Sequence, residues 1–386
     1  MTIGINASSV IALKSGLSFY IVNLIEAMAK IDRQHRFVVF CKKSEASTFG
    51  SLPENTKVVA NAPASNILRL LWEQTILPFV LCRKYKITTL FSPNYTCPVF
   101  KPGFYSVVAF HDSSFFAHGY LFAPARRIFK HIIRVSTACA DRVIAVSGFT
   151  KQDIERHLKL KDTNKIAVVY NAAHSRFNST PLSQDQILAI REKYKLNGRY
   201  ILFSGLYEPR KNIPRLIQAF SMICDRVKEN LAIAGGGGWW QNQVLEAYEN
   251  SPAKERIILL GYVQNSDLPA LYKEATLFAF PTLYEGFGIS ALESVACGTP
   301  VLASDNSSLP EVVGHAGVYV DPFNVSDIAE KLSAVLTNPT LLAELKSKCA
   351  EQAAKFSWEK CAKETLACLH ATGAHDSNIR KTSRKS

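Results

Sequence analysis

The stretch LFAFPTLYEGFGISALESVACGTPVLASDNSSLPEVVG, residues 277–314, decides the fold. Its pattern predicts a buried strand over 277–280, a glycine-bearing loop over 281–288, and a helix over 289–297. After a short turn, a second buried strand is expected over 301–304. A strand, a helix and a second strand in this order form a βαβ unit, so we expect an α/β protein whose loop is placed for ligand contact.

The loop carries residues suited to a nucleotide sugar. Gly286 and Gly288 leave the start of the predicted helix without side chains, and backbone N–H groups at a helix start favour an anion such as a diphosphate. Glu285 and Glu293 are suited to accept hydrogen bonds from hydroxyl groups on either side of it. The alternative is an ordinary parallel-sheet unit with solvated acids.

The spacing of these acids resembles a known family. Glu285-x7-Glu293 lies inside EGFGISALESVACGTPV and is followed by SSLPEV, which resembles the signature of the retaining glycosyltransferases of family 4. The resemblance covers nearly the whole chain. It implies the GT-B fold, in which two Rossmann-like domains face each other across a cleft.

The resemblance also implies a domain plan. We expect an N-terminal acceptor-side domain over 1–178 and a C-terminal nucleotide-sugar-binding domain over 179–356. A final helix over 357–375 is expected to cross back to the first domain. The remaining residues, 376–386, carry basic side chains without an apolar pattern and are expected to form a disordered tail.

A second loop supplies cations. The stretch GLYEPRKN, residues 205–212, follows a predicted strand and precedes a predicted helix. Arg210 offers a planar fork and Lys211 a point charge, both suited to a diphosphate. Next to an ordinary loop, the two would form a solvated pair. The stretch is similar to the phosphate-binding loop of the family, which places Gly205 beside the donor.

The resemblance also assigns two residues of the first half, Gly16 and His111, to the donor site. The stretch SGLSFYIVNL, residues 15–24, is similar to the first glycine loop of the family, so Gly16 is expected to face the donor. His111 precedes Asp112 at the end of a predicted strand, where ligands collect in open α/β sheets. A structural histidine is the alternative, but the resemblance implies that His111 faces the donor sugar.

The resemblance thus implies Arg210, Lys211, Glu285 and His111 as catalytic residues. Glu285 would hold the sugar hydroxyls and Glu293 the ribose, while the two cations and the helix start stabilise the leaving diphosphate. No covalent nucleophile is assigned, and neither a metal ion nor a cofactor is expected, because no DxD-like carboxylate pair is present. The expected donor-binding residues are Gly16, Gly205, Arg210, Lys211, Tyr262, Val263, Leu268, Glu285, Gly286, Phe287, Gly288, Ile289 and Glu293.

Length and composition are consistent with this interpretation. The 386 residues suit two domains, and 47% hydrophobic with 20% charged residues describe a soluble globular chain. Nine scattered cysteines without CxxC pairs indicate reduced thiols. No secretory signal and no apolar run of about 18 residues are present. We therefore expect a cytoplasmic enzyme, peripheral on the inner face of the cytoplasmic membrane.

The charge is uneven. The net charge is +13, and residues 1–178 hold 23 Lys and Arg against 10 Asp and Glu, whereas the rest hold 22 of each. A bilayer surface or nucleic acid would suit such a basic half, and a merely solvated surface is the alternative. The segment 67–86, with basic residues around Trp72, suits a helix at a membrane interface or one packed on the sheet, which Pro78 would kink.

The expected function is retaining, metal-independent transfer of a hexosyl group from a nucleotide sugar to a saccharide or lipid-linked saccharide acceptor. The product would serve polysaccharide or lipopolysaccharide biosynthesis. His111 and the general likeness favour GDP-mannose, with a UDP-sugar as the alternative. A GT-B nucleotide-sugar epimerase, a silent scaffold and a nucleic-acid-binding protein are the other classes, although no nucleic-acid-binding motif is present and no nucleic acid is expected.

Overall fold

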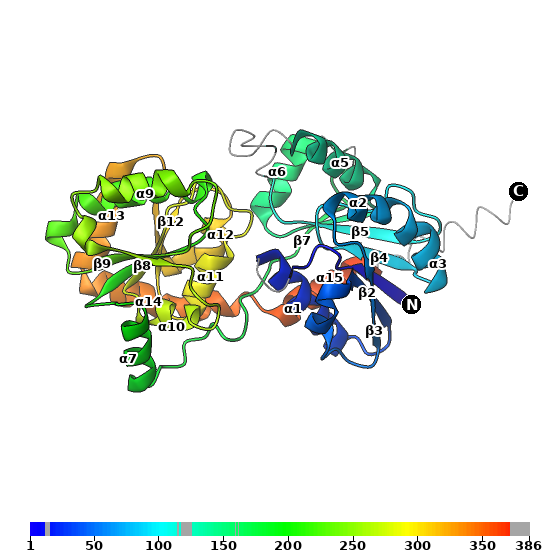
Figure 1. Ribbon diagram of the computed structural model, residues 1–386, viewed down its shortest axis with the longest axis horizontal. Helices are drawn as coiled ribbons and strands as arrows, with labels where there is room; N and C mark the ends of the chain where they lie inside the picture. The colour runs from blue at the N-terminus through cyan, green and yellow to red at the C-terminus, as the bar shows by residue number, and fades with distance from the viewer. Residues whose placement is uncertain (12–15, 114–115, 117–125, 159, 161, 371–386) are drawn as a thin grey trace, which may run out of the picture. The chain divides into compact units, whose positions relative to one another are not determined.

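The computed structural model describes residues 1–11, 16–113, 116, 126–158, 160 and 162–370. The chain divides into two compact units, one formed by 1–171 together with 357–386 and the other by 172–356. Each unit contains a parallel sheet with helices packed on it (Figure 1). The basic tail expected over 376–386 lies outside the described residues.

The first unit contains a sheet of seven strands in the order β3-β2-β1-β4-β5-β6-β7, all paired in parallel. Ile5 of β1 lies opposite Val39 of β2 on one side and Phe91 of β4 on the other. These apolar residues are fully buried, as expected for a parallel sheet covered on both faces. The strands are β1 (Thr2–Asn6), β2 (Arg36–Lys42), β3 (Thr56–Ala62), β4 (Thr89–Ser92), β5 (Tyr105–Phe110), β6 (Arg142–Ala145) and β7 (Ile166–Val168).

The helices of this unit include the first and the last described ones of the chain. The buried faces of α1 and α15 belong to one apolar cluster, which includes Ile21 and Leu24 of α1 and Leu366 and Leu369 of α15. The elements are α1 (Gly16–Ile31), η1 (Lys43–Phe49), α2 (Asn66–Gln74), the π-helical η2 (Leu77–Leu81), α3 (Cys82–Lys84), α5 (Arg126–Cys139), α6 (Gly148–Leu158) and α15 (Trp358–His370).

The segment 67–86 is not one continuous helix. α2 ends at Gln74, and the chain resumes as the π-helical turn η2, which contains Pro78 near its start. Proline lacks the N–H that a continuous helix requires, which explains the break. Among the described helices, none combines the length and the apolar character needed to cross a bilayer.

The second unit contains a six-stranded sheet in the order β10-β9-β8-β11-β12-β13. The two strands predicted over 277–280 and 301–304 are β11 and β12, and they pair in parallel, with Phe278 opposite Val301. The prediction of a βαβ unit is therefore confirmed. The strands are β8 (Tyr200–Ser204), β9 (Asn230–Ala234), β10 (Ile257–Gly261), β11 (Leu277–Phe280), β12 (Val301–Ser304) and β13 (Gly317–Val320).

The helices of the second unit connect these strands and enclose one large apolar core. All nine cysteines of the chain are free thiols, and all but Cys139 are buried. The elements are α7 (Gln184–Lys193), η4 (Pro209–Lys211), α8 (Ile213–Ser221), η5 (Cys224–Arg226), α9 (Gln241–Glu249), η6 (Lys254–Arg256), α10 (Leu268–Glu274), α11 (Ile289–Ala296), α12 (Leu309–Val313), η7 (Gly314–Ala316), α13 (Val325–Thr337) and α14 (Pro339–Ala354).

Candidate active site

The strand order of the second unit reverses between β8 and β11. In open α/β sheets, ligands bind outside the carboxyl ends of the strands at such a point. The loop 205–212 follows β8 and the loop 281–288 follows β11, so both leave the same place on the sheet edge. The backbone N–H of Leu283 donates to the carbonyl of Arg210 at 2.7 Å, which ties the two loops together.

A buried ion cluster joins the two loops. Oε1 of Glu285 accepts hydrogen bonds from Nζ of Lys211 at 2.8 Å and from Nη1 of Arg210 at 2.9 Å. The Nε of Arg210 donates to Glu208 at 2.9 Å. Lys211 and Glu285 are each only 7% exposed. The structure thus brings three of the residues predicted from sequence into direct contact, with Glu208 orienting the guanidinium.

The protonation states follow from burial and charge. Burial raises the pKa of Glu285, but Lys211 and then Arg210 outweigh this effect, and the pKa is lowered overall. Burial lowers the pKa of the Lys211 ammonium, and the Glu285 carboxylate offsets this in part. An ionised Glu285 can accept hydrogen bonds from hydroxyl groups but cannot donate one.

Helix α11 begins a few residues after Glu285 in the sequence. Gly288 is the N-cap residue, makes no side-chain cap, and has φ of +87°, a left-handed conformation that favours glycine. A Cβ atom there would lie 2.6 Å from a methyl group of Leu309. Phe287 is buried against Phe356, with ring centroids 5.8 Å apart, so its side chain belongs to the core.

The glycines at the end of β9 bring another loop against 205–212. A Cβ atom on Gly235 would lie 1.8 Å from the carbonyl oxygen of Gly205, so the two backbones pack directly on each other. The N–H of Gly205 donates to Ala234, and the N–H of Gly235 donates to Gly261, which closes β10. These contacts fix the loop that carries Arg210.

Glu293 lies in α11, inside the second unit. Burial raises its pKa to about 8, although the charge of Arg176 and the Tyr272 hydroxyl, 3.5 Å away, act in the opposite direction. Sequence reasoning missed Arg176, because the expected domain plan placed it in the N-terminal domain over 1–178, whereas it belongs to the unit 172–356. Arg176 precedes α7, the first helix of the second unit, and no local pattern there points to Glu293.

The other predicted residues of the second unit lie farther along the sheet edge. Tyr262 and Val263 follow β10, and Leu268 begins α10. Because β9 separates β10 from β8, these residues start about 10 Å from the 205–212 loop. Tyr262 is 79% exposed, whereas Val263 is buried. The structure therefore does not bring these three residues into the ion cluster, although all three belong to the unit that contains it.

Two predicted residues belong to the first unit. Gly16 is exposed at the start of α1, and the preceding residues 12–15 lie outside the described part of the chain. His111 follows β5, and its Nε2 lies 2.7 Å from the carbonyl oxygen of Pro93. A carbonyl only accepts, so Nε2 carries the proton and Nδ1 is the acceptor of this ring. Burial lowers the pKa of His111, which keeps the ring neutral.

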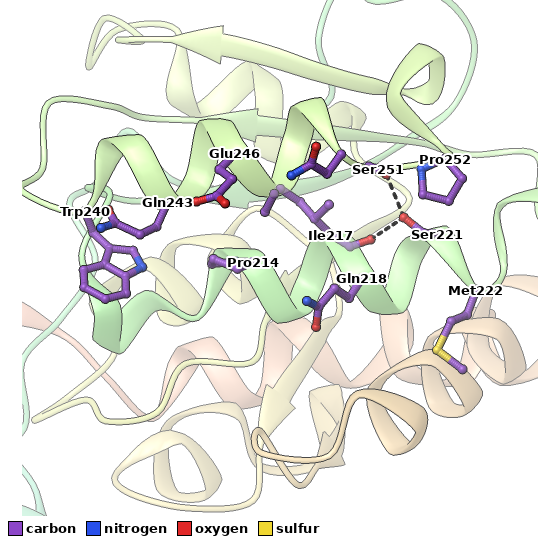
Figure 2. Close-up of a pocket in the computed structure, with 12 residues that line it drawn as sticks. Pro214, Ile217, Gln218, Ser221, Met222, Trp240, Gln243, Glu246, Ser251 and Pro252 are labelled. Atoms are coloured by element: carbon purple, nitrogen blue, oxygen red, sulfur yellow. Dashed lines mark hydrogen bonds between the residues drawn. The ribbon is translucent and has the colours of Figure 1, made fainter.

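A hollow of about 540 Å³ between α8 and α9 is distinct from this site (Figure 2). Trp240, Gln243 and Glu246 line one side and Gln218 the other, and the Ser221 and Ser251 hydroxyls, 2.7 Å apart, close one end. None of the residues predicted from sequence lines it. We therefore place the candidate site at the ion cluster.

Comparisons with known proteins identify the family and the fold. The family model described as Glycosyltransferase Family 4 matches residues 14–175, and the one described as Glycosyl transferases group 1 matches residues 186–356. O-antigen chain mannosyltransferase B from Escherichia coli is 33% identical over 288 residues, which cover 74% of each chain.

Two solved structures illustrate the fold. WaaG, described as a glycosyltransferase involved in lipopolysaccharide biosynthesis, aligns with a TM-score of 0.73 at 15% identity, over 95% of this chain and 99% of that one. Anabaena Alr3699/HepE, solved in complex with UDP-glucose, aligns with a TM-score of 0.73 at 17% identity, over 96% of this chain and all of the other. The chain is therefore a glycosyltransferase of family 4 with the GT-B fold.

Proposed function

We propose that this enzyme transfers a hexosyl group from a nucleotide sugar to a saccharide or lipid-linked saccharide acceptor, with retention of configuration and without a metal ion. The product would serve polysaccharide or lipopolysaccharide biosynthesis. The observation that carries this proposal is the contact of Arg210 and Lys211 with Glu285 at the point where the strand order reverses.

The cluster offers what glycosyl transfer requires. The leaving group is a diphosphate, and charge accumulates on it as the bond to the sugar breaks, so fixed cations lower the barrier. Arg210 and Lys211 are assigned to this task, together with the uncapped start of α11. Glu285 is assigned to the sugar hydroxyls, and Glu293 to the ribose.

Glu285 has a second effect on the donor site. In the ligand-free protein it occupies hydrogen-bonding capacity of both cations. A diphosphate must therefore share or displace these contacts. The sugar hydroxyls that reach Glu285 would then complete a site in which each buried charge keeps a partner, as buried charges require.

We propose GDP-mannose as the donor. Support comes from the O-antigen mannosyltransferase relative and from the resemblance around His111. A UDP-sugar is the second candidate, because the HepE structure contains UDP-glucose. A thermal-shift comparison of GDP, UDP, dTDP and ADP in a chelator separates them. A nucleotide present at about 100 times its dissociation constant stabilises the folded protein that binds it by about 2.7 kcal/mol.

The expected result is a selective shift with GDP that Glu293→Ala abolishes and that Glu330→Ala, a change at an exposed residue of α13, preserves. A selective shift with UDP would move the assignment to UDP-sugars. If none of the four nucleotides shifted the melting temperature, the assigned donor site would be wrong.

For the acceptor side, we propose that the first unit docks on an anionic bilayer through α2 and η2. In α2, the charged face is buried and the apolar face is exposed. Its charged residues Arg69 and Glu73 are 7% and 1% exposed, whereas Leu68 and Leu71 are 55% and 58% exposed. A surface helix of a soluble protein normally buries its apolar stripe and exposes its charges.

The buried face of α2 has polar partners. Oε2 of Glu73 accepts from Nδ2 of Asn6 at 2.8 Å and lies 3.6 Å from Nη1 of Arg69. These contacts hold the charged face against the sheet, and so direct the leucines outward. Of the two alternatives expected for the segment around Trp72, the structure packs this side chain on the sheet, where it is only 5% exposed, so it is not an interfacial anchor.

The exposed apolar face continues beyond α2. Ile76, Phe79 and Val80 of the next turn are exposed, and a hollow of about 470 Å³ opens between α2 and α5. Its lining is almost entirely apolar: Ile67, Leu70, Leu71, Gln74, Val99, His131, Ile132 and Val135. Arg83, Lys84 and Lys86 follow directly and are exposed. Apolar side chains beside cations suit an anionic lipid surface.

Vesicle binding tests this part of the proposal. We expect binding to vesicles containing phosphatidylglycerol and weak binding to pure phosphatidylcholine. Changing Leu68 and Leu71 together to serine removes about 1.5 kcal/mol of apolar burial each, which lowers the partition coefficient roughly 100-fold. Leu188→Ser, at an exposed leucine of α7 in the second unit, is the matched control. An equal loss in both variants would refute the assignment of this face.

A further inference from the structure

Two histidines and an aspartate meet where α1 and α15 end. Asp32 follows α1, His35 lies three residues later, and His370 is the last residue of α15. Nδ1 of His35 lies 2.7 Å from Oδ2 of Asp32, and Nε2 of His370 lies 3.3 Å from the same oxygen. One ligand atom from each of the three residues lies within 4.8 Å of the others.

The aspartate is held in place by the backbone. Its other oxygen, Oδ1, accepts from the N–H groups of Gln34 and His35, both at 3.2 Å. Asp32 itself is 9% exposed. The carboxylate is therefore fixed with Oδ2 directed toward the two imidazole rings, whose centroids lie 4.6 Å apart.

His370 is incompletely satisfied. Its Nε2 is shielded from solvent yet has no well-aligned hydrogen bond among the described residues. A buried polar atom left in this way destabilises the fold, and a ligand that contacts it removes the penalty. Its close contact with Oδ2 of Asp32, at 3.3 Å, therefore leaves this nitrogen able to bind a further ligand.

We propose that Asp32, His35 and His370 bind a divalent transition-metal ion, with zinc as the preferred ion, and that this ion fastens the last helix to the first. Two imidazole nitrogens and one carboxylate oxygen form a donor set of the kind that zinc selects, with water as the fourth ligand. Neighbouring ligand atoms on a tetrahedral zinc lie about 3.3 Å apart, given metal–ligand distances of about 2.0 Å.

The observed spacings fit this geometry. The separation of 3.3 Å between His370 Nε2 and Asp32 Oδ2 already suits two ligands of one ion. The shorter contact of 2.7 Å between His35 and Asp32 is a hydrogen bond, and it opens by about 0.6 Å when an ion replaces the proton between them. The site contains none of the residues assigned to glycosyl transfer.

The test uses the full chain, stripped with a chelator and dialysed against zinc, with bound metal measured by mass spectrometry. We expect one zinc per chain, a higher melting temperature, and visible absorption bands of tetrahedral geometry when cobalt replaces zinc. His370→Gln and His35→Gln each lower zinc affinity more than about 10-fold. Asp32→Asn also alters the turn after α1, so His370→Gln is the primary variant.

The matched control is His157→Gln, because His157 also lies near an aspartate, Asp153 at 3.5 Å, but without a second histidine. It should leave zinc binding unchanged. The proposal is overturned if wild type and His370→Gln bind zinc equally, or if bound cobalt keeps the spectrum of the aqueous ion. Either result would leave a hydrogen-bonded cluster only. Nucleotide binding is measured separately, so the donor-site proposal stands or fails on its own.

Discussion

Replacing Glu293, a partly buried residue of α11, with glutamine removes its titratable proton while keeping the shape of the side chain. Burial raises the pKa of Glu293 from 4.5 to about 8. At neutral pH the folded protein therefore holds this carboxyl mainly protonated, whereas the unfolded chain holds it ionised. Glu293→Gln retains the uncharged form at every pH.

The magnitude follows from linkage. A carboxyl whose pKa rises on folding binds more protons in the folded state, so stability falls as pH increases through the window between pH 4.5 and about 8. One pKa unit corresponds to about 1.4 kcal/mol, and the penalty is about 2 kcal/mol at pH 6 and about 4 kcal/mol at pH 8. The penalty thus grows by about 2 kcal/mol between pH 6 and pH 8. For a unit of this size, that change shifts the melting temperature by about 5 to 9 °C.

The assay is a series of thermal melts of both proteins between pH 5 and pH 8.5. We expect the variant to be more stable than wild type, with a gap that is small at pH 5 and widens by about 5 to 9 °C between pH 6 and pH 8. Glu330→Gln, at an exposed position of α13, controls for a general effect of removing a carboxyl group. If wild type and Glu293→Gln showed parallel pH dependence, Glu293 would be ionised in the folded protein and the argument from burial would be wrong.

Four other substitutions probe the second unit. Arg210→Ala and Lys211→Ala each remove a charge-assisted hydrogen bond of about 1.5 to 3 kcal/mol, and steady-state kinetics should show a larger loss in kcat than in donor affinity. Glu285→Gln releases both cations from their carboxylate, so calorimetry should find nucleoside diphosphate binding unchanged or tighter while transfer falls; weaker binding would contradict this. Gly288→Ala adds a clash to a left-handed residue and should destabilise by about 1 to 3 kcal/mol more than Gly103→Ala, which has nearly the same φ in open space; equal denaturation midpoints would refute it.

The strands around the site could be predicted because each is a short apolar run buried on both faces. The residues 277–280 and 301–304 illustrate this, since their boundaries match β11 and β12. The sequence also placed Arg210, Lys211 and Glu285 on loops at one sheet edge. It could not predict that the cations bind Glu285 directly. That contact arises because β8 and β11, which precede the two loops, are neighbours in the sheet although they are far apart in sequence.

Helical periodicity identifies two faces but not which face is buried. For α2, the pattern around Trp72 left open whether the helix lies at a membrane interface or packs on the sheet. The decision depends on Asn6 of β1, which binds Glu73 and draws the charged face inward. A partner 67 residues away in sequence leaves no local signal. Arg176 was missed for a similar reason, since its effect on Glu293 arises only from the folded second unit.

The way the chain passes between the two units has a consequence for biosynthesis. The second unit is a continuous segment, 172–356, inserted into the first, which α15 completes. During synthesis, domains fold as their residues emerge. The second unit can therefore close while the first still lacks Leu366 and Leu369, the residues that cover α1. The first unit is therefore the first to be synthesised but the last to complete its fold. Its apolar core stays incomplete until the ribosome has passed residue 370.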